Sequence, residues 1–566
     1  MLLCCKVPSK IYIFVQTIFP KTMKNFSKLL LIIFIAFLLF YWQMPVIRYG
    51  FSQIGIIVLI VSIILFLLST SIKFIQKGND VSMDMGQKTA PAWIKYLFIA
   101  SLVYVVVLPF VTSSTLFHAR KYQQLIGKVN IGKKISDHII PISLDEVRIV
   151  DKDLANLVGE KVLGSQPALG SQVELGEFCI QKVNNQLVWV APLEHSGFFK
   201  WFSNSEGTPG YVVVSVTNER DVKLVQSVQN KPIKIKYQEG AFLFDNLQRH
   251  VYFNGHTTVG LTDFSFEIDD AGKPFWVITT FEKAVGFGGK NANGIIVVDA
   301  QNGDIQQFGL NNIPKWVDRV QPSNFIQTQL NDWGEYVNGY WNFANTDKLQ
   351  TTEKMMLVYG KDNKSYWYTG LTSVGKDEST VGFMLVDTRT KEATYYKQSG
   401  ATELAAQHSA EGKVQEKGYR ATTPIPYNIN NIPTYVMTLK DNGGLVKMYA
   451  MVGINDYTVV GVGNTLRETL TSFKNTYNMT GNKISGNTPS VKKEVISTIV
   501  RIQNDVKNGN SFYYFILKDS PKVFVGSSNI STQLPISQIG DKIRVTYDED
   551  LEKVIDISTF ENFDLK

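Results

Sequence analysis

The run IIVLIVSIILFLL at residues 56–68 is apolar around its whole circumference when drawn as a helix, apart from one serine. A helix on the surface of a folded core shows a polar stripe instead. The run lies in the second of three apolar stretches, residues 29–47, 51–72 and 94–117, each close to the ~20 residues that a helix needs to cross ~30 Å of hydrocarbon. The alternative is a helix buried in a core. The sequence therefore predicts three N-terminal transmembrane helices within residues 29–117, followed by one large body.

Basic residues around these stretches indicate the side of the membrane on which the body lies. One group precedes the first stretch and fills the connection between the second and third: Lys24, Lys28, Lys73, Lys77, Lys88 and Lys95. Such segments stay in the cytoplasm, so three crossings place the body outside. A second group, after the third stretch, favours the opposite orientation: Arg120, Lys121, Lys128, Lys133 and Lys134. Long folded domains are translocated with little regard to charge, so we predict a multi-pass protein with an extracytoplasmic body.

The segment 1–28 is expected to be a cytoplasmic tail. Its first 22 residues show no periodicity, whereas MKNFSK at residues 23–28, directly before an apolar run, is typical of a translational start. We interpret residues 1–22 as a mis-annotated start. No cleavage site is obvious before Trp42, so the first stretch is interpreted as an uncleaved signal anchor.

Composition narrows the classes of partner. A net charge of +7 over 566 residues is small and spread along the chain, which argues against a nucleic-acid partner. Lysine is more frequent than arginine, and asparagine and isoleucine are common, a usage typical of an AT-rich bacterial or phage genome. Besides Cys4 and Cys5 the chain has only Cys179, so the body has no intramolecular disulfide and no cysteine-based metal site.

Beyond Phe117 the pattern predicts an α+β body whose sheets are mainly antiparallel. We expect an N-terminal α+β subdomain at 118–220, two sheet regions at 221–350 and 351–478, a polar linker at 479–494 and a small β-barrel at 495–566. Strands are expected where Val, Ile and aromatic residues gather between turn residues: Leu187–Ala191, Tyr211–Val216, Ile233–Tyr237, Phe275–Phe281 and Ile295–Asp299. Helices are expected from Pro322-Ser323 and over Thr402–Lys417.

An internal echo supports the two sheet regions. The sequence VDAQNGDI at 298–305 returns as VDTRTKEA at 386–393, and both predict a strand, a tight turn and a strand. The first copy, with the helix at Thr402–Lys417 and the strand near Tyr435, resembles the PepSY-type modules of bacterial exported proteins. That resemblance implies a non-catalytic envelope module similar to domains thought to inhibit or chaperone peptidases or to sense the cell wall. The alternative is an unrelated twisted antiparallel sheet.

The C-terminal domain resembles an OB-type five-stranded barrel. Its expected strands share the spacing of that fold: Val495–Ile502, Ser511–Leu517, Lys522–Val525, Lys542–Tyr547 and Lys553–Ser558. The aromatic run Phe512–Phe515 could be a stacking platform for bases. Successive residues of a strand point to opposite faces, however, so half of that run is expected in the core and a structural or protein-binding role is preferred.

Motifs for chemistry are absent, and we assign no catalytic, cofactor-binding or metal-binding residue. The run GFGGK at 286–290 lacks the spacing of a phosphate loop and is interpreted as a hairpin tip. Only His195, His250 and His256 are general-base candidates, and Asp245 or Asp263 could complete a site with the last two. An unbroken strand over 249–256 would hold those two histidines ~20 Å apart.

The aromatic stretch Trp189–Phe202 has two interpretations. If the stretch is exposed, it would be a patch that contacts a partner or a membrane surface. If it is buried, Phe198, Phe199, Trp201 and Phe202 would fill the core, and we prefer this interpretation.

The overall hypothesis is a non-enzymatic bacterial envelope protein, in contact with the lipid bilayer, whose body binds protein or cell-wall partners. The alternatives are an envelope enzyme or peptidase regulator with a site of scattered residues, and a sensory or transport-associated subunit. The oligomeric state stays open.

Overall fold

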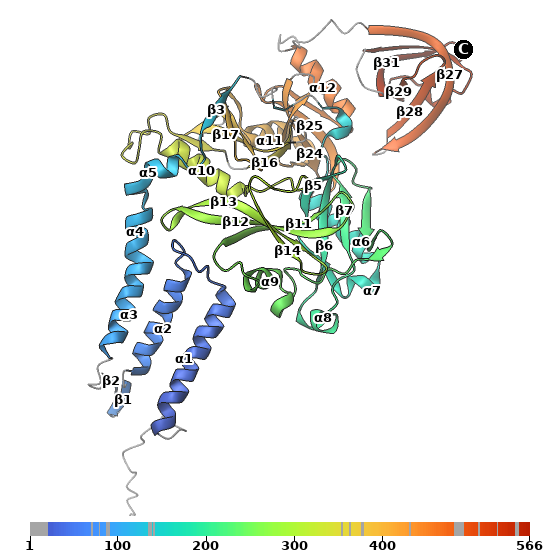
Figure 1. Cartoon of the computed structure of the whole chain (residues 1–566). Coiled ribbons are helices and arrows are strands. Elements are labelled where there is room, and N and C mark those ends of the chain that lie inside the picture. Colours follow the sequence, from blue (N-terminus) through green and yellow to red (C-terminus); the bar gives the residue numbers. More distant parts are fainter. Residues whose placement is uncertain are drawn as a thin grey trace, which may run out of the picture. The chain divides into compact units, whose positions relative to one another are not determined.

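A computed structural model gives the architecture of the chain (Figure 1). It describes residues 21–69, 72–77, 80–85, 91–133, 138–139, 142–352, 355–360, 364–374, 379–429, 432–479, 492–507, 510–528, 530–548 and 554–565. The chain divides into two compact units. Unit 1 is Met1–His118 with Tyr252–Gly260 and Lys283–Gly289, and unit 2 is Ala119–Val251, Leu261–Glu282 and Lys290–Lys566.

Unit 1 contains the apolar helices, and one of them is long enough to cross a membrane. This helix, Ala92–Ser113, has an apolar composition, and little of it is buried. It is continuous through α3 (Ala92–Leu102), a π-helical turn (Val103–Val107) and α4 (Leu108–Ser113). The π turn precedes Pro109, whose missing N–H disturbs the regular helical hydrogen bonds.

The prediction of three transmembrane helices is wrong, because the other two apolar helices are too short. α1 (Lys21–Gln43) and α2 (Gln53–Ser69) contribute apolar segments at Leu30–Gln43 and Gln53–Leu67, which fall in the range of 10–17 residues. The first stretch was expected to continue to residue 47, but Met44 has a φ of 42° and Pro45 follows. Helical backbone cannot continue through a positive φ. Only one helix among the described residues meets this length criterion, so the prediction of a multi-pass protein is not supported.

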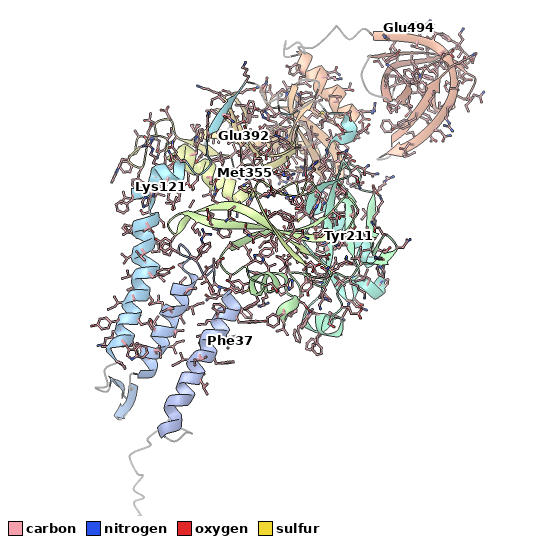
Figure 2. The ribbon with its side chains drawn as sticks, in the orientation of Figure 1. Phe37, Lys121, Tyr211, Met355, Glu392 and Glu494 are labelled. Carbon is pink, nitrogen blue, oxygen red and sulfur yellow. The ribbon has the colours of Figure 1, made fainter. Side chains whose placement is uncertain are left out.

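Two segments from later in the chain pack on the helices within unit 1. At the hairpin tip, the ring of Phe287 lies 5.3 Å from both Tyr49 and Tyr104. In the second segment, the Tyr252 hydroxyl donates to the Pro45 carbonyl oxygen over 2.6 Å. Phe37, labelled in Figure 2, projects from α1 and is 59% exposed.

Unit 2 begins with a helix packed on a small antiparallel sheet. The sheet has the order β4 (Val173–Leu175), β6 (Gln186–His195), β7 (Tyr211–Ser215) and β8 (Val222–Val225), and β5 (Cys179–Val183) also pairs with β6. α6 (Lys152–Gly164) starts at Asp151, whose side chain accepts the Leu154 N–H as an N-cap. Leu154, Trp189 and Val212 join a core that extends to residues of the third sheet, such as Trp367.

The second and third sheets follow in the chain. The second is β11 (Gly260–Ile268), β12 (Pro274–Val285), β13 (Gly288–Asp299) and β14 (Ile305–Gly309), in that order. α10 (Ser323–Glu335) begins directly after Pro322, as predicted. The third is β15 (Leu349–Thr351), β17 (Ser365–Ser373), β19 (Gly382–Asp387), β20 (Ala393–Tyr396) and β3 (Val129–Gly132), with β16 (Met356–Tyr359) also paired to β17. β3 pairs with β20 in parallel, so a strand from the start of the body completes a sheet made mostly of much later residues.

The fourth sheet carries two helices. Its order is β22 (Arg420–Ala421), β24 (Ile432–Lys440), β25 (Val446–Gly453) and β26 (Val460–Gly463), and β23 (Ile425–Ile429) also pairs with β24. α11 (Glu403–Gly412), expected over Thr402–Lys417, follows its N-cap Thr402 and ends earlier than expected. α12 (Leu466–Met479) lies against β26. A methyl group at Gly461 would meet the Phe473 backbone nitrogen at 2.3 Å, so only glycine permits this approach.

The sequence echo is a repeated turn. Asp299 Oδ1 accepts the Gln301 N–H over 2.9 Å between β13 and β14, and Asp387 Oδ1 accepts the Arg389 N–H over 2.9 Å between β19 and β20. The two hairpins lie in different sheets.

The last domain is a closed barrel. Its strands run in the order β27 (Lys492–Lys507), β28 (Asn510–Leu517), β29 (Val523–Ser527), β31 (Val554–Asn562) and β30 (Lys542–Asp548), and β30 closes onto β27. Phe515 and Leu517 are buried in its core, while Tyr514, which points to the other face of β28, is only half-buried.

One expected strand, Ile233–Tyr237, is absent from the described chain. Ile233 and Ile235 are buried, but their segment is irregular, with a single bridge from Ile235 to Thr208. His250 lies in helix α9 (Leu247–Phe253), so residues 249–256 are not one unbroken strand.

Candidate functional site

A polar cleft in unit 2 has the geometry best suited to binding. Its volume is about 670 Å³, and it lies among the β5–β6 hairpin, the β7–β8 connection, the segment 142–148, β16 and β23. Tyr211, labelled in Figure 2, begins β7 of the sheet that forms one wall. The polar lining side chains are Asp145, Glu146, Arg148, Lys182, Asn184, Asn185, Gln186, Ser215, Thr217, Asn218, Asp221, Lys223, Tyr359 and Tyr427.

Arg148 connects three walls of the cleft. Its backbone N–H donates to the Tyr427 hydroxyl over 3.1 Å, and its Nη1 donates to the Leu357 carbonyl oxygen over 2.9 Å. The guanidinium lies 6.0 Å from the ring centre of Trp189. Its Nε is buried with no hydrogen-bond partner in the described part of the chain. Arg148 therefore holds β16 and β23 in place and keeps one donor without an acceptor among the described residues.

Asp318 anchors the opposite side. One carboxylate oxygen, Oδ2, accepts the Lys182 backbone N–H over 2.8 Å and the Tyr359 hydroxyl over 3.2 Å. Burial raises the pKa of the Asp318 carboxyl, although these two donors and Arg319 oppose the shift. Burial also raises the pKa of the Tyr359 hydroxyl well above its ordinary value. Tyr359 is therefore a neutral donor, and it presents the aromatic surface of the cleft on this side.

A buried polar cluster lies on the strands beside the cleft. Ser265 Oγ donates to Glu267 Oε1 over 3.0 Å, and Arg319 Nη2 donates to Ser265 Oγ over 3.2 Å. The other Glu267 oxygen, Oε2, is buried without a partner among the described residues. Burial raises the pKa of the Glu267 carboxyl to about 8, despite the nearby Arg319 guanidinium. Burial likewise raises the pKa of the Cys179 thiol, so this cluster is suited to structure and not to nucleophilic attack.

The side chains that line the cleft are suited to binding a polar ligand. Three acidic side chains, Asp145, Glu146 and Asp221, share the lining with three basic ones, Arg148, Lys182 and Lys223. No histidine contributes to it, and no group of three or more His, Cys, Asp or Glu within the described residues could hold a metal ion. Mixed charge, amides and two tyrosines fit a polar ligand that carries both signs of charge.

Sequence reasoning missed this site because its residues come from distant segments of the chain. Arg148 and Tyr427, for example, are 279 positions apart and meet through a single hydrogen bond. No local motif in either segment signals that contact.

The three histidines of the sequence analysis lie outside the cleft. His195 is buried at the end of β6, where burial lowers the pKa of its imidazole. His250 Nε2 lies 2.7 Å from the Gly303 carbonyl oxygen, and its ring packs 4.1 Å from the ring of Tyr237. His256 follows α9, and burial lowers the pKa of its imidazole.

The two expected carboxylate partners of these histidines have other places in the fold. Asp245 accepts the indole N–H of Trp201 over 3.2 Å, and Asp263 is exposed with a φ of 53°. These placements support the simpler interpretation of His250 and His256 as structural and surface residues.

Three of the four aromatic residues at 198–202 are exposed, so the preferred interpretation of these residues as a core plug is wrong for those three. Trp201 is 8% exposed, whereas Phe198, Phe199 and Phe202 are 45%, 82% and 72% exposed. All four lie on α8 (Phe198–Ser203), a helix of two turns with only one face toward the core.

Two of the three comparisons with known proteins found no match. No family model matches the chain, and no curated protein matches it. Among solved structures, Trypanosoma rangeli sialidase is similar at a TM-score of 0.17 and 9% identity, over 69% of this chain and 55% of the sialidase. An ACO/RPE65 chimera has a TM-score of 0.13 at 9% identity, over 50% of this chain and 48% of the chimera. This chain thus spans about half the length of each of the two structures.

Proposed function

We propose that this chain is a non-enzymatic, membrane-anchored component of a bacterial cell envelope, and that its body binds a peptide segment of a protein or cell-wall partner in the cleft. The observation that carries the proposal is the lining of the cleft, where three acidic and three basic side chains stand among amide and hydroxyl groups. A peptide supplies amine, carboxylate and backbone amide groups that this set can pair. The unpartnered Nε of Arg148 offers such a ligand a buried donor.

The anchor in this proposal is the helix Ala92–Ser113, and the body after it is extracytoplasmic. Lys73, Lys77 and Lys95 lie at or before the start of that helix and favour a cytoplasmic location for that end of the helix. The test is digestion by added protease in intact cells, with an epitope tag after Lys566. Loss of the tag without lysis supports the orientation, and protection until lysis contradicts it.

Binding in the cleft can be tested by photo-crosslinking in intact cells. A benzophenone amino acid at Gln186, which is exposed at the cleft, should yield a crosslinked peptide that mass spectrometry identifies. The same probe at Lys161, exposed on α6 and not part of the cleft, is the matched control. The identified peptide, made synthetically, should bind the purified full chain and bind less to the Lys182→Glu variant. Equal crosslinking from both positions, or equal binding by both proteins, would reject the cleft as the site.

We also propose that the terminal barrel is an OB-like interaction module and that the sheets before it are PepSY-like. The first part is supported by a five-stranded closed barrel in which β29 and β31 pair in parallel. The second rests on the paired aspartate-capped hairpins at Asp299 and Asp387. Both proposals give these domains a binding role and no catalytic role.

A further inference from the structure

Six apolar side chains of unit 2 form an exposed surface, which we name the aromatic patch. Three belong to α8 and three to the segment that precedes α9: Phe198, Phe199, Phe202, Phe242, Leu243 and Phe244. Their exposed fractions are 45%, 82%, 72%, 36%, 54% and 61%. Single exposed apolar residues are normal on proteins, but a contiguous group of this size marks a surface that another phase or molecule covers.

The patch is rigid, because its two segments are fixed to each other. The ring of Phe198 lies 5.2 Å from that of Phe242, edge to face, and stacks on Phe202 at 6.1 Å. Beneath them, the buried Trp201 donates its indole N–H to Asp245 over 3.2 Å. The rings are therefore held outward before anything binds, and little conformational entropy is lost when they are covered.

The chemistry of the patch fits the interfacial zone of a lipid bilayer. Aromatic side chains concentrate in that zone, and amphipathic helices that lie in it combine Phe and Trp with lysine. Lys200 is exposed within α8, between Phe199 and Trp201, where its ammonium group could reach lipid phosphates.

A short stretch of chain joins this surface to the unit that contains the proposed anchor. Only residues 245–251 separate Phe244 from Tyr252, which belongs to unit 1. The protein also has one helix able to cross a bilayer. We infer that the aromatic patch inserts its phenylalanine rings into the lipid–water interface and so gives the body a second, peripheral hold on the membrane. The inference rests on the proposed membrane anchoring.

The test uses full-length protein reconstituted in vesicles, with Cys4, Cys5 and Cys179 replaced by serine. An environment-sensitive fluorophore is attached through Phe199→Cys, or through Phe202→Cys in a second variant. The control is Lys161→Cys, an exposed position on α6 of the same unit. Flotation of each protein with the vesicles, resistant to carbonate, establishes the anchoring separately.

The expected result is a blue-shifted emission from both patch positions and a loss of that emission in vesicles whose lipids carry a nitroxide near the headgroup. The label at the control position should show neither change. Emission at the patch that matches the control overturns the inference, even when the protein floats. A blue shift without quenching also overturns it, because protein then covers the patch. A protein that fails to float refutes the anchoring instead.

Discussion

Replacing Glu267 by glutamine should change how the stability of unit 2 depends on pH. The Glu267 carboxyl is 1% exposed, and burial raises its pKa from 4.5 to about 8. Between these two values the folded protein keeps the carboxyl protonated, whereas the unfolded chain has lost the proton. The folded state then binds more protons, so the free energy of unfolding falls as the pH rises. Glu267→Gln removes this titration and should flatten the profile.

The size of the effect follows from the shift. Within the window between pH 4.5 and 8, each pH unit removes ~1.4 kcal/mol of stability from the parent through this one group. From pH 5.5 to 7.5 the parent should therefore lose ~3 kcal/mol more than the variant, which is roughly a 100-fold difference in the population of the opened state. Above pH 8 the Glu267 carboxyl is charged in both the folded and the unfolded parent. The difference in unfolding free energy between parent and variant should then stop growing.

Cys179 provides the assay, because its thiol belongs to the same cluster and becomes reactive when the cluster opens. The rate of its modification by a disulfide reagent is measured for both proteins at each pH, with Cys4 and Cys5 replaced by serine. Comparison at equal pH cancels the intrinsic pH dependence of the thiol. Glu160→Gln, an exposed position on α6, is the control and should follow the parent. A ratio of rates that stays constant from about pH 5.5 to 7.5 would refute the assignment of a raised pKa to Glu267.

Three further predictions concern packing and buried polar contacts. Phe473→Ala should cost ~3–5 kcal/mol of unfolding free energy in urea titrations, because this ring is wholly buried against Gly461, whereas Phe473→Leu should cost less. Lys440→Met should destabilise by ~1–3 kcal/mol and lower the midpoint of thermal unfolding, because it leaves the partly buried Asp151, 2.6 Å from the Lys440 ammonium, without its ion-pair partner. Exposed Lys413→Met is its control, and equal midpoints would contradict the reasoning. Tyr435→Phe and Tyr368→Phe should each cost ~1 kcal/mol, because their hydroxyls lie 3.0 Å apart in the core, and additive losses in the double variant would argue against a direct bond.

Local patterns predicted the elements whose causes are local. The start of α10 after Pro322 and the cap of α11 at Thr402 follow from single residues and their neighbours. The aspartate-capped turns after β13 and β19 are likewise determined within a few residues. Where the local signal was mixed, prediction failed. Residues 233–237 have the composition of a strand, yet their segment is irregular, and Ile233 and Ile235 are buried by tertiary packing.

The sequence by itself determined that the first hundred or so residues contain apolar helices, that the body is rich in sheet, and that no local motif for catalysis is present. Tertiary structure decided the rest, because the decisive contacts join distant segments. Arg148 meets Leu357 and Tyr427, and Asp318 meets Lys182 and Tyr359, across 41 to 279 positions of sequence. Periodicity also could not show which helices are long enough to cross a membrane, since the end of α1 depends on the backbone at Met44. A hydrophobic side chain gains free energy when it leaves water, but the packing of the whole chain determines which hydrophobic side chains are buried. In this protein Trp201 is buried, whereas Phe199 is exposed.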